Sequence, residues 1–152
     1  MESTHTSGSD SAVPQPPKGF IRHLPTIARV LLGLMFFVFG LNGFLNFIPP
    51  PPKDTLPAGL LAFSEAMMKT GYLFQLIKGT EVLVGALLLL NRFVPLALTI
   101  LAPVIVNIVA VHAFLAPSGV GMAIVILALE LYLAWAYRAA FRPMLAARAT
   151  PA

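Results

Sequence analysis

The pattern of apolar and polar residues divides the chain into long apolar segments joined by short polar or proline-rich stretches. The apolar segments run at about 26–48, 71–91, 94–116 and 119–141. A helix needs about 20 apolar residues to cross the hydrocarbon layer of a bilayer, and each segment has that length. The joints "NRF" and "APSG" are short enough to make successive helices antiparallel. The pattern therefore predicts an all-α fold, an integral membrane four-helix bundle over residues 26–141.

The first joint, residues 49–70, is longer and has a pattern of its own. The prolines at 49–52 cannot continue a helix and should end the first segment. The sequence "AGLLAFSEAMMK" places apolar residues on one helical face and polar residues largely elsewhere: Leu60, Phe63 and Met67 against Ser64, Glu65 and Lys69. This arrangement is typical of a short amphipathic helix that lies on the membrane surface or caps the bundle, in the first extracytoplasmic loop. A plain loop is the alternative.

The two ends of the chain read as tails. Residues 1–25 begin with a Ser/Thr/Pro-rich stretch that has little to bury, which predicts a disordered cytoplasmic tail. This stretch is not a signal peptide, because the apolar run after it is longer than the ~7–15 residues of a signal sequence. Residues 142–152 form a second cytoplasmic tail.

Composition supports the membrane class and removes several chemistries. Apolar residues make up 58% of the chain, against roughly 45–50% in soluble domains. The absence of cysteine excludes disulfides, thiolate metal sites and cysteine redox chemistry within the chain. The net charge of +4 comes from basic residues at the ends of apolar segments, so nucleic acid is not an expected partner.

The same basic residues predict an orientation. With four spans, seven basic residues lie on one side of the membrane, and only Lys53 and Lys69 lie on the other. Those on the richer side are Lys18, Arg22, Arg29, Arg92, Arg138, Arg142 and Arg148. Cytoplasmic loops carry the excess of lysine and arginine, so both termini are predicted in the cytoplasm. Arg29 reads most simply as an anchor whose side chain reaches the interface.

Polar residues inside the spans gather between the membrane midplane and the outer surface. Glu81 falls near the middle of the second span, and Lys78 lies about 4–5 Å outward of it at 1.5 Å per residue. A charged residue near the centre costs roughly 2.5–3.5 kcal/mol, so this pair should face neighbouring helices and form an ion pair at i, i+3. The pattern predicts an outward-opening polar pocket with these ligand-binding candidates: Lys78, Glu81, Asn107, His112, Glu130, Asn42 and Asn46.

Several of these candidates also have a structural interpretation. The ion pair can simply hold helices together, and Glu130 and Asn107 can be hydrogen-bonding contacts between helices. Gly33 and Gly40 form a smooth stripe on the first helix, and Gly85 continues the stripe of Lys78 and Glu81, so close helix contact is expected there.

The chemistry of the pocket favours binding over catalysis. A metal site would need His112, Glu81 and Glu130, but the Glu-x-x-His repeat of carboxylate bundles is missing and Lys78 competes for the carboxylate, so no metal is predicted. The spans hold no serine or cysteine nucleophile, and the catalytic residues stay unassigned. A lipophilic molecule with a polar head, such as a quinone, suits the pocket, with its head at Lys78, His112 or Asn107 and its tail among Leu and Phe side chains.

Two stretches, "IARVLLGLMFFVFGLNGF" and "LIKGTEVLVGALLLLNRFVPLALTILAP", resemble the DoxX/DoxD-like family of small bacterial membrane proteins. The matching elements are Ala28–Arg29, Gly40–Gly43, and Gly79 with Glu81, and the resemblance covers about 26–141. It implies four helices in the bacterial inner membrane and a quinone-linked or redox-accessory role. The family assigns no catalytic residues.

The resemblance and the pocket together lead to two hypotheses. In the first, the chain is an accessory or quinone-binding subunit of a membrane redox system, not an enzyme alone, and works with a membrane or periplasmic redox partner. In the second, it is a non-enzymatic carrier of a small molecule or lipid, or a membrane assembly factor whose polar residues are structural. The oligomeric state is open in both.

Overall fold

The computed structural model describes residues 22–146 and 148, and within these residues every regular element is a helix. The long helices are α2 (Leu24–Leu45), α4 (Leu73–Leu89), α5 (Val94–Phe114) and α6 (Val120–Ala136). The short elements are α3 (Ala58–Lys69), α7 (Arg138–Phe141) and the 3-10 turns η1 (Lys53–Thr55) and η2 (Pro117–Gly119). The predicted all-α architecture is therefore confirmed for the described residues. Most of the predicted N-terminal tail, residues 1–21, lies outside them, as do residues 147 and 149–152.

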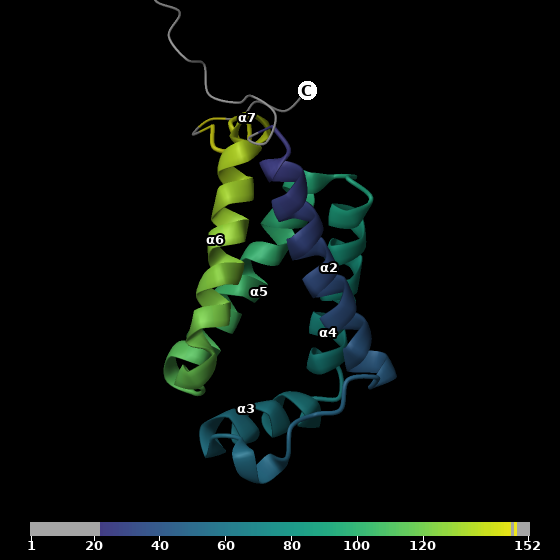
Figure 1. The fold of residues 1–152 in the computed structure, drawn as a ribbon, viewed down its shortest axis with the longest axis vertical. Coiled ribbons are helices and arrows are strands. Elements are labelled where there is room, and N and C mark those ends of the chain that lie inside the picture. Colours follow the sequence, from purple (N-terminus) through teal and green to yellow (C-terminus); the bar gives the residue numbers. More distant parts are fainter. Residues whose placement is uncertain (1–21, 147, 149–152) are drawn as a thin grey trace, which may run out of the picture.

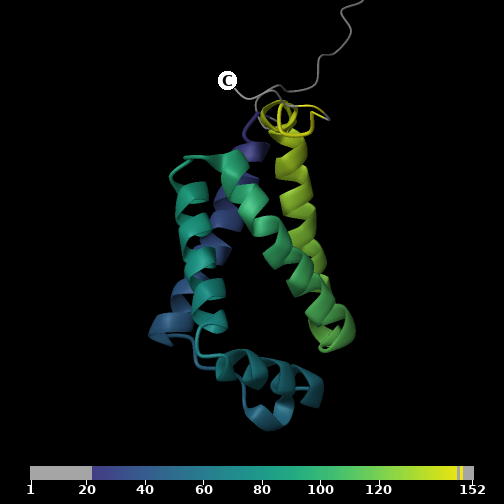
Figure 2. The same cartoon turned by 180° about the vertical axis from the view of Figure 1, so that it is seen from behind.

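The four long helices form a ring in which each packs against two others. α2 packs along α4 and contacts α6, while α5 packs against α4 and α6. Both described ends of the chain lie at one end of this ring, at the top of Figures 1 and 2. At the opposite end, α3 lies across the helices and meets α4 at a bend of 94°.

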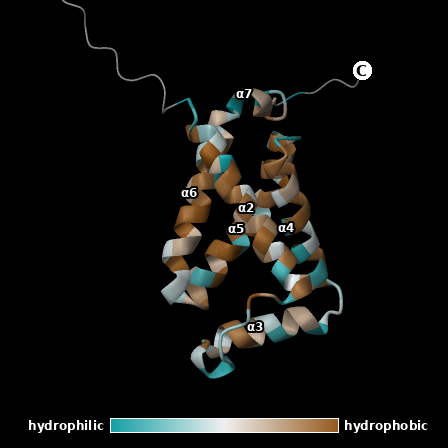
Figure 3. Cartoon of the chain, turned by 45° about the vertical axis from the view of Figure 1, so that its right-hand side comes forward, coloured by the Kyte–Doolittle hydropathy of each residue, from teal (hydrophilic) through white to brown (hydrophobic). Residues whose placement is uncertain are grey.

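Three segments of the structure are long and apolar enough to cross a membrane: Leu24–Leu45, Val94–Phe114 and Pro117–Ala136. α4 has 17 residues and passes the same test only together with α3, across their bend. Figure 3 shows the apolar character along α2, α5 and α6. By length and composition, three helices can span a membrane, or four if α3 and α4 count as one bent span.

The first apolar segment ends earlier than predicted. α2 stops at Leu45, not Ile48, because Asn46 takes a left-handed conformation with φ 50°, which asparagine tolerates better than most residues. The Asn42 side chain then accepts a hydrogen bond from the Ile48 N–H at 2.6 Å. The chain therefore leaves the helix before it reaches the prolines.

The second and fourth segments are also shorter than predicted. α4 starts at Leu73, not at residue 71, because Gly71 has φ +77° and turns the chain, and the Thr70 hydroxyl accepts a hydrogen bond from the Leu73 N–H at 3.0 Å. The expected 119–141 helix breaks at Tyr137, where ψ is 14°, so that α7 is separate from α6.

The predicted helix over residues 58–69 is present as α3. Its half-buried residues are Leu60, Leu61, Phe63, Ser64 and Met67, and Glu65 and Lys69 are exposed. Ser64 thus lies on the covered side of α3, where the pattern had placed it with the polar residues.

α2 and α4 approach each other closely through glycines, as the small-residue stripes predicted. A Cβ atom placed on Gly85 would lie 2.5 Å from the Phe37 backbone nitrogen. A Cβ atom on Gly40 would lie 2.8 Å from the Val82 nitrogen, and one on Gly33 would lie 3.2 Å from the Gly85 carbonyl oxygen. Backbone-to-backbone contact of this kind needs residues without side chains.

Arg29 is buried, which corrects its interpretation as an interfacial anchor. Its guanidinium donates hydrogen bonds to the carbonyl of Leu88 and, at 3.4 Å, to that of Leu89. These carbonyls belong to the last turn of α4, which carries the negative end of the helix dipole. The Leu88 carbonyl also accepts a hydrogen bond from the Asn91 N–H at 3.2 Å. Arg29 therefore joins α2 to the C-terminal end of α4.

The hydrophobic core lies in the half of the ring that is nearer the termini. Its buried residues fall between Ala28 and Phe36 in α2, Val84 and Leu88 in α4, Val94 and Ile105 in α5, and Ile126 and Leu133 in α6. Towards α3 the same helices carry mostly half-buried and exposed side chains. This difference in packing leaves room for a cavity on the α3 side of the core.

Candidate functional site

A cavity of about 300 Å³ lies between the four long helices, on the α3 side of the core. Its polar lining consists of Lys78, Glu81 and His112. Its apolar walls come from α2, α5 and α6: Met35, Phe36, Phe39, Ile108, Met122 and Ile126. A few convergent polar groups in an otherwise apolar, concave site are typical of small-molecule pockets.

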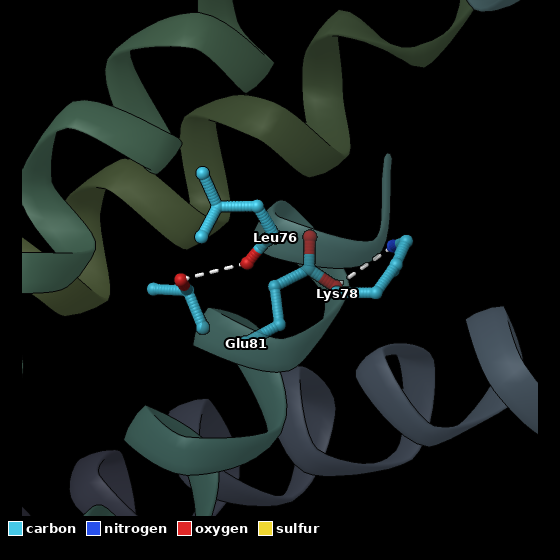
Figure 4. Close-up of polar contacts among 4 residues, drawn as sticks. Leu76, Lys78 and Glu81 are labelled. Atoms are coloured by element: carbon cyan, nitrogen blue, oxygen red, sulfur yellow. Dashed lines mark hydrogen bonds and ion pairs between the residues drawn. The ribbon is translucent and has the colours of Figure 1, made fainter. Parts of the chain in front are cut away.

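Lys78 and Glu81 form an ion pair within α4. The lysine Nζ lies 2.7 Å from the glutamate Oε2, as Figure 4 shows. The side chain of Glu81 is 7% exposed and that of Lys78 is 22% exposed. In the same part of α4, the Leu76 carbonyl accepts a hydrogen bond from the Thr80 hydroxyl at 2.8 Å. The predicted i, i+3 pair is thus present, and it turns toward the cavity.

Gly43 of α2 makes room for the aliphatic part of Lys78. A Cβ atom on Gly43 would lie 2.5 Å from the lysine Cγ and 2.6 Å from its Cδ. The methylenes of Lys78 therefore lie against bare backbone, and its ammonium group extends past them. This packing holds the ion pair at the rim of the cavity.

His112 contributes a ring nitrogen from α5. Its Nδ1 lies 2.8 Å from the carbonyl oxygen of Ile108, one turn earlier. A carbonyl oxygen only accepts, so Nδ1 carries the proton of this hydrogen bond, and Nε2 is left as the ring nitrogen that can bind a ligand. The Cδ2–Nε2 edge of the ring packs against Gly119, where a Cβ atom would lie 2.7 Å from Nε2. The missing side chain of Gly119 therefore leaves space beside Nε2.

The other predicted site residues lie elsewhere. Asn107 is exposed and lines a separate pocket of about 370 Å³ between α3, α4 and α5, together with Phe63 and Met67. Asn42 and Asn46 form the C-terminal end of α2. The structure therefore does not bring these asparagines to the cavity of Lys78, Glu81 and His112, and they lie at other joints of the fold.

Glu130 also lies apart from the cavity. It lines a crevice of about 250 Å³ with Thr99, Ala102 and Phe141. The residue is buried, and its Oε2 has no hydrogen-bond partner among the described residues. Glu130 therefore lies on the side of α6 that meets α5, away from the cavity.

Two features of the site had no clear signal in the sequence. Met35 and Met122 form walls of the cavity, yet a methionine in an apolar helix looks like any other core residue. Gly119 looked like part of a short joint, but it makes room for the His112 ring. These residues reach the site only because helices that are distant in the sequence pack together.

The arrangement offers a defined set of hydrogen bonds. Lys78 keeps two ammonium protons beyond the one given to Glu81, and His112 Nε2 can accept. Within residues 22–146 and 148, no three His, Cys, Asp or Glu side chains lie close enough to hold a metal ion. The cavity can therefore bind a small head group that accepts from the lysine and donates to the histidine.

Comparisons of the chain with protein-family models, with curated proteins and with solved structures found no match.

Proposed function

We propose that the chain is a four-span protein of the bacterial inner membrane, with both termini in the cytoplasm and α3 on the outer face. α4 runs along α2 through glycine contacts, so a membrane that surrounds α2 also surrounds α4. Its 17 residues are at the lower end of the ~17–25 that a spanning helix uses. The described basic residues fit this orientation, because Arg22, Arg92 and Arg138 lie at the end with the termini.

Within this membrane protein, we propose that the cavity binds a quinone and that the chain is a DoxX-like accessory or quinone-binding subunit of a membrane redox system. The observation that carries this proposal is the meeting of Lys78, Glu81 and His112 in a cavity whose remaining walls are apolar. A quinone likewise has a polar part, the two oxygens on its ring, and an apolar part, its tail. A redox partner would supply or remove the electrons.

The polar side chains of the cavity can form hydrogen bonds with both the quinone and the quinol form of the head group. The ammonium of Lys78 donates to a quinone carbonyl, and its charge is balanced by Glu81 at 2.7 Å. The Nε2 of His112 accepts from a quinol hydroxyl, because Nδ1 already donates to Ile108. A site that matches both forms can hold the molecule before and after its reduction.

The first test is to purify the protein in mild detergent, extract it with organic solvent and quantify quinone by mass spectrometry. We expect near-stoichiometric quinone with the wild type and with Glu130→Gln, and loss of quinone with Glu81→Gln. Glu130→Gln is the matched control, because it makes the same change on a buried glutamate outside the cavity. Absence of quinone from the wild type, or equal amounts in all three proteins, would refute the proposal.

A second candidate function rests on the ion pair itself. Lys78 and Glu81 satisfy each other within one helix, so they can be structural in a non-enzymatic carrier of small molecules or lipids, or in an assembly factor. This alternative predicts no quinone enrichment in any of the proteins and a Glu81→Gln variant that is only less stable.

A further inference from the structure

We infer that the ligand of the cavity carries an apolar chain that leaves the ring sideways, between α2 and α6, into the bilayer. This inference rests on the proposed function and specifies the class of ligand: a chain-bearing quinone that reaches the site laterally from the membrane. It also predicts which residues allow the site to bind a ligand with a long apolar chain.

The first observation is a second, apolar groove beside the cavity. The groove has a volume of about 430 Å³, and α2 and α6 form its two sides. Leu31, Leu34 and Val38 lie on the α2 side, and Val125 and Leu129 on the α6 side. The groove follows α2 from Leu31 to Phe39, about 12 Å at 1.5 Å per residue.

The second observation is that the cavity and the groove share a wall. Met35, Phe39 and Met122 line both spaces. Two of these three residues are methionines, whose unbranched side chains change rotamer easily and fit irregular shapes. We expect rotamer changes of Met35 and Met122, beside Phe39, to join the polar cavity to the apolar groove.

The core closes the route along the axis of the ring toward the termini. Leu32, Leu101 and Leu133 are fully buried there, each with 0% exposure. A chain that entered between them would need to displace packed side chains, and cores tolerate such overpacking poorly. The groove between α2 and α6 has no such barrier, because Phe39 and Met122 are 52% and 61% exposed.

The groove should permit a long chain without adding much affinity. An apolar chain that moves from lipid into an apolar groove exchanges one apolar environment for another, so the hydrophobic gain is small. The head group at Lys78 and His112 would provide the binding energy. Filling the groove should therefore exclude ligands with a long chain and leave binding of the bare head unchanged.

Val125→Trp tests this expectation, with Ile124→Trp as the matched control. Val125 lines the groove and is 52% exposed, whereas the adjacent Ile124 is 55% exposed and does not line it. The purified proteins are reconstituted in lipid nanodiscs and titrated with two probes, a chainless benzoquinone and a polyprenyl quinone with the same head. Binding is measured as the mole fraction of quinone at half saturation.

We expect Val125→Trp to weaken binding of the polyprenyl quinone by about tenfold or more and to leave the chainless quinone within about twofold. Ile124→Trp should leave both unchanged. Equal effects of the two variants, or an equal loss of both probes with Val125→Trp, would overturn the lateral route while the quinone site stands. If the wild type binds neither probe, the proposed function itself fails and this inference fails with it.

Discussion

At the residue scale, the two buried glutamates differ in whether a charged partner lies beside them. Glu81 has the ammonium of Lys78 at 2.7 Å, whereas the Oε2 of Glu130 has no hydrogen-bond partner among the described residues. Removing charges from water is costly, and an ion pair offsets that cost only with good geometry. Breaking such a pair on one side leaves an uncompensated charge, which is worse than removing both charges together. Lys78 and Glu81 should therefore behave as a unit.

This unit predicts a specific double-mutant cycle. We expect Lys78→Met and Glu81→Met each to lower stability by roughly 1–3 kcal/mol, less than for a fully buried pair because Lys78 is 22% exposed. The double variant should recover most of that loss, because two apolar side chains replace the pair. Thermal unfolding in mild detergent, followed by the fluorescence of Trp135, the single tryptophan, measures the effect. Losses that simply add in the double variant would show that the two residues do not depend on each other.

The sequence predicted the position of the polar residues along each helix, but not the side of the helix that they face. Lys78 and Glu81 were placed correctly as a pair, because a spacing of three residues puts two side chains on the same helical face. Asn107 and Glu130 were predicted at a similar depth, yet they lie in other pockets. Which face of a helix meets which neighbour is decided by long-range packing, which a single sequence does not encode in a local pattern.

At the scale of the helix, the seam between α2 and α4 depends on glycines at defined positions. The apolar pattern predicted where the helices lie along the chain. The observed helix ends differ from the predicted ones by a few residues, because the backbone conformations of Asn46, Gly71 and Tyr137 end or begin the helices there. The stripes of small residues were a reliable signal, since only glycine permits such close contact. They also supply a matched pair of sites on one helix for a test.

Gly85→Ala and Gly79→Ala make the same change six residues apart in α4. A Cβ atom on Gly85 would lie 2.5 Å from the Phe37 nitrogen, while one on Gly79 would meet nothing within 4 Å. We expect Gly85→Ala to destabilise the protein by about 1–3 kcal/mol through overpacking, and Gly79→Ala to be neutral or to stabilise it by up to ~1 kcal/mol through helix propensity. Thermal unfolding of both variants in the same detergent measures the difference. Equal melting temperatures would mean that α2 and α4 are not in close contact at Gly85.

At the scale of the whole molecule, the helices pack tightly at the end with the termini and separate toward α3. The apolar pattern predicted four long helices in antiparallel order, and these form in the described residues. It could not predict the uneven packing, because that depends on how side chains from four distant segments fit together. The cavity is a consequence of this uneven packing, and it lies where the polar residues of α4 and α5 meet the open half of the ring.

The proposed orientation gives the two ends of the molecule different exposure in a living cell. The end with the termini carries Arg92, Arg138 and Arg142, whereas the α3 end carries Lys53 and Lys69 beside Asp54 and Glu65. Because cytoplasmic segments hold the excess of basic residues, Ser118 in η2 should face outward and Ala146 inward. Both positions are exposed, and the chain has no cysteine of its own, so a single introduced cysteine is the only thiol that a maleimide can label.

We expect a membrane-impermeant maleimide to label Ser118→Cys in intact spheroplasts, and to label Ala146→Cys only after the membrane is permeabilised. The reverse pattern would place the termini outside and the cavity toward the cytoplasm, although the fold would be unchanged. Labelling of both positions in sealed cells would mean that the two ends of the ring do not lie on opposite sides of a membrane, which would remove the basis for a ligand that enters from the bilayer. The orientation of the site therefore decides from which side a redox partner can reach a quinone head held between Lys78 and His112.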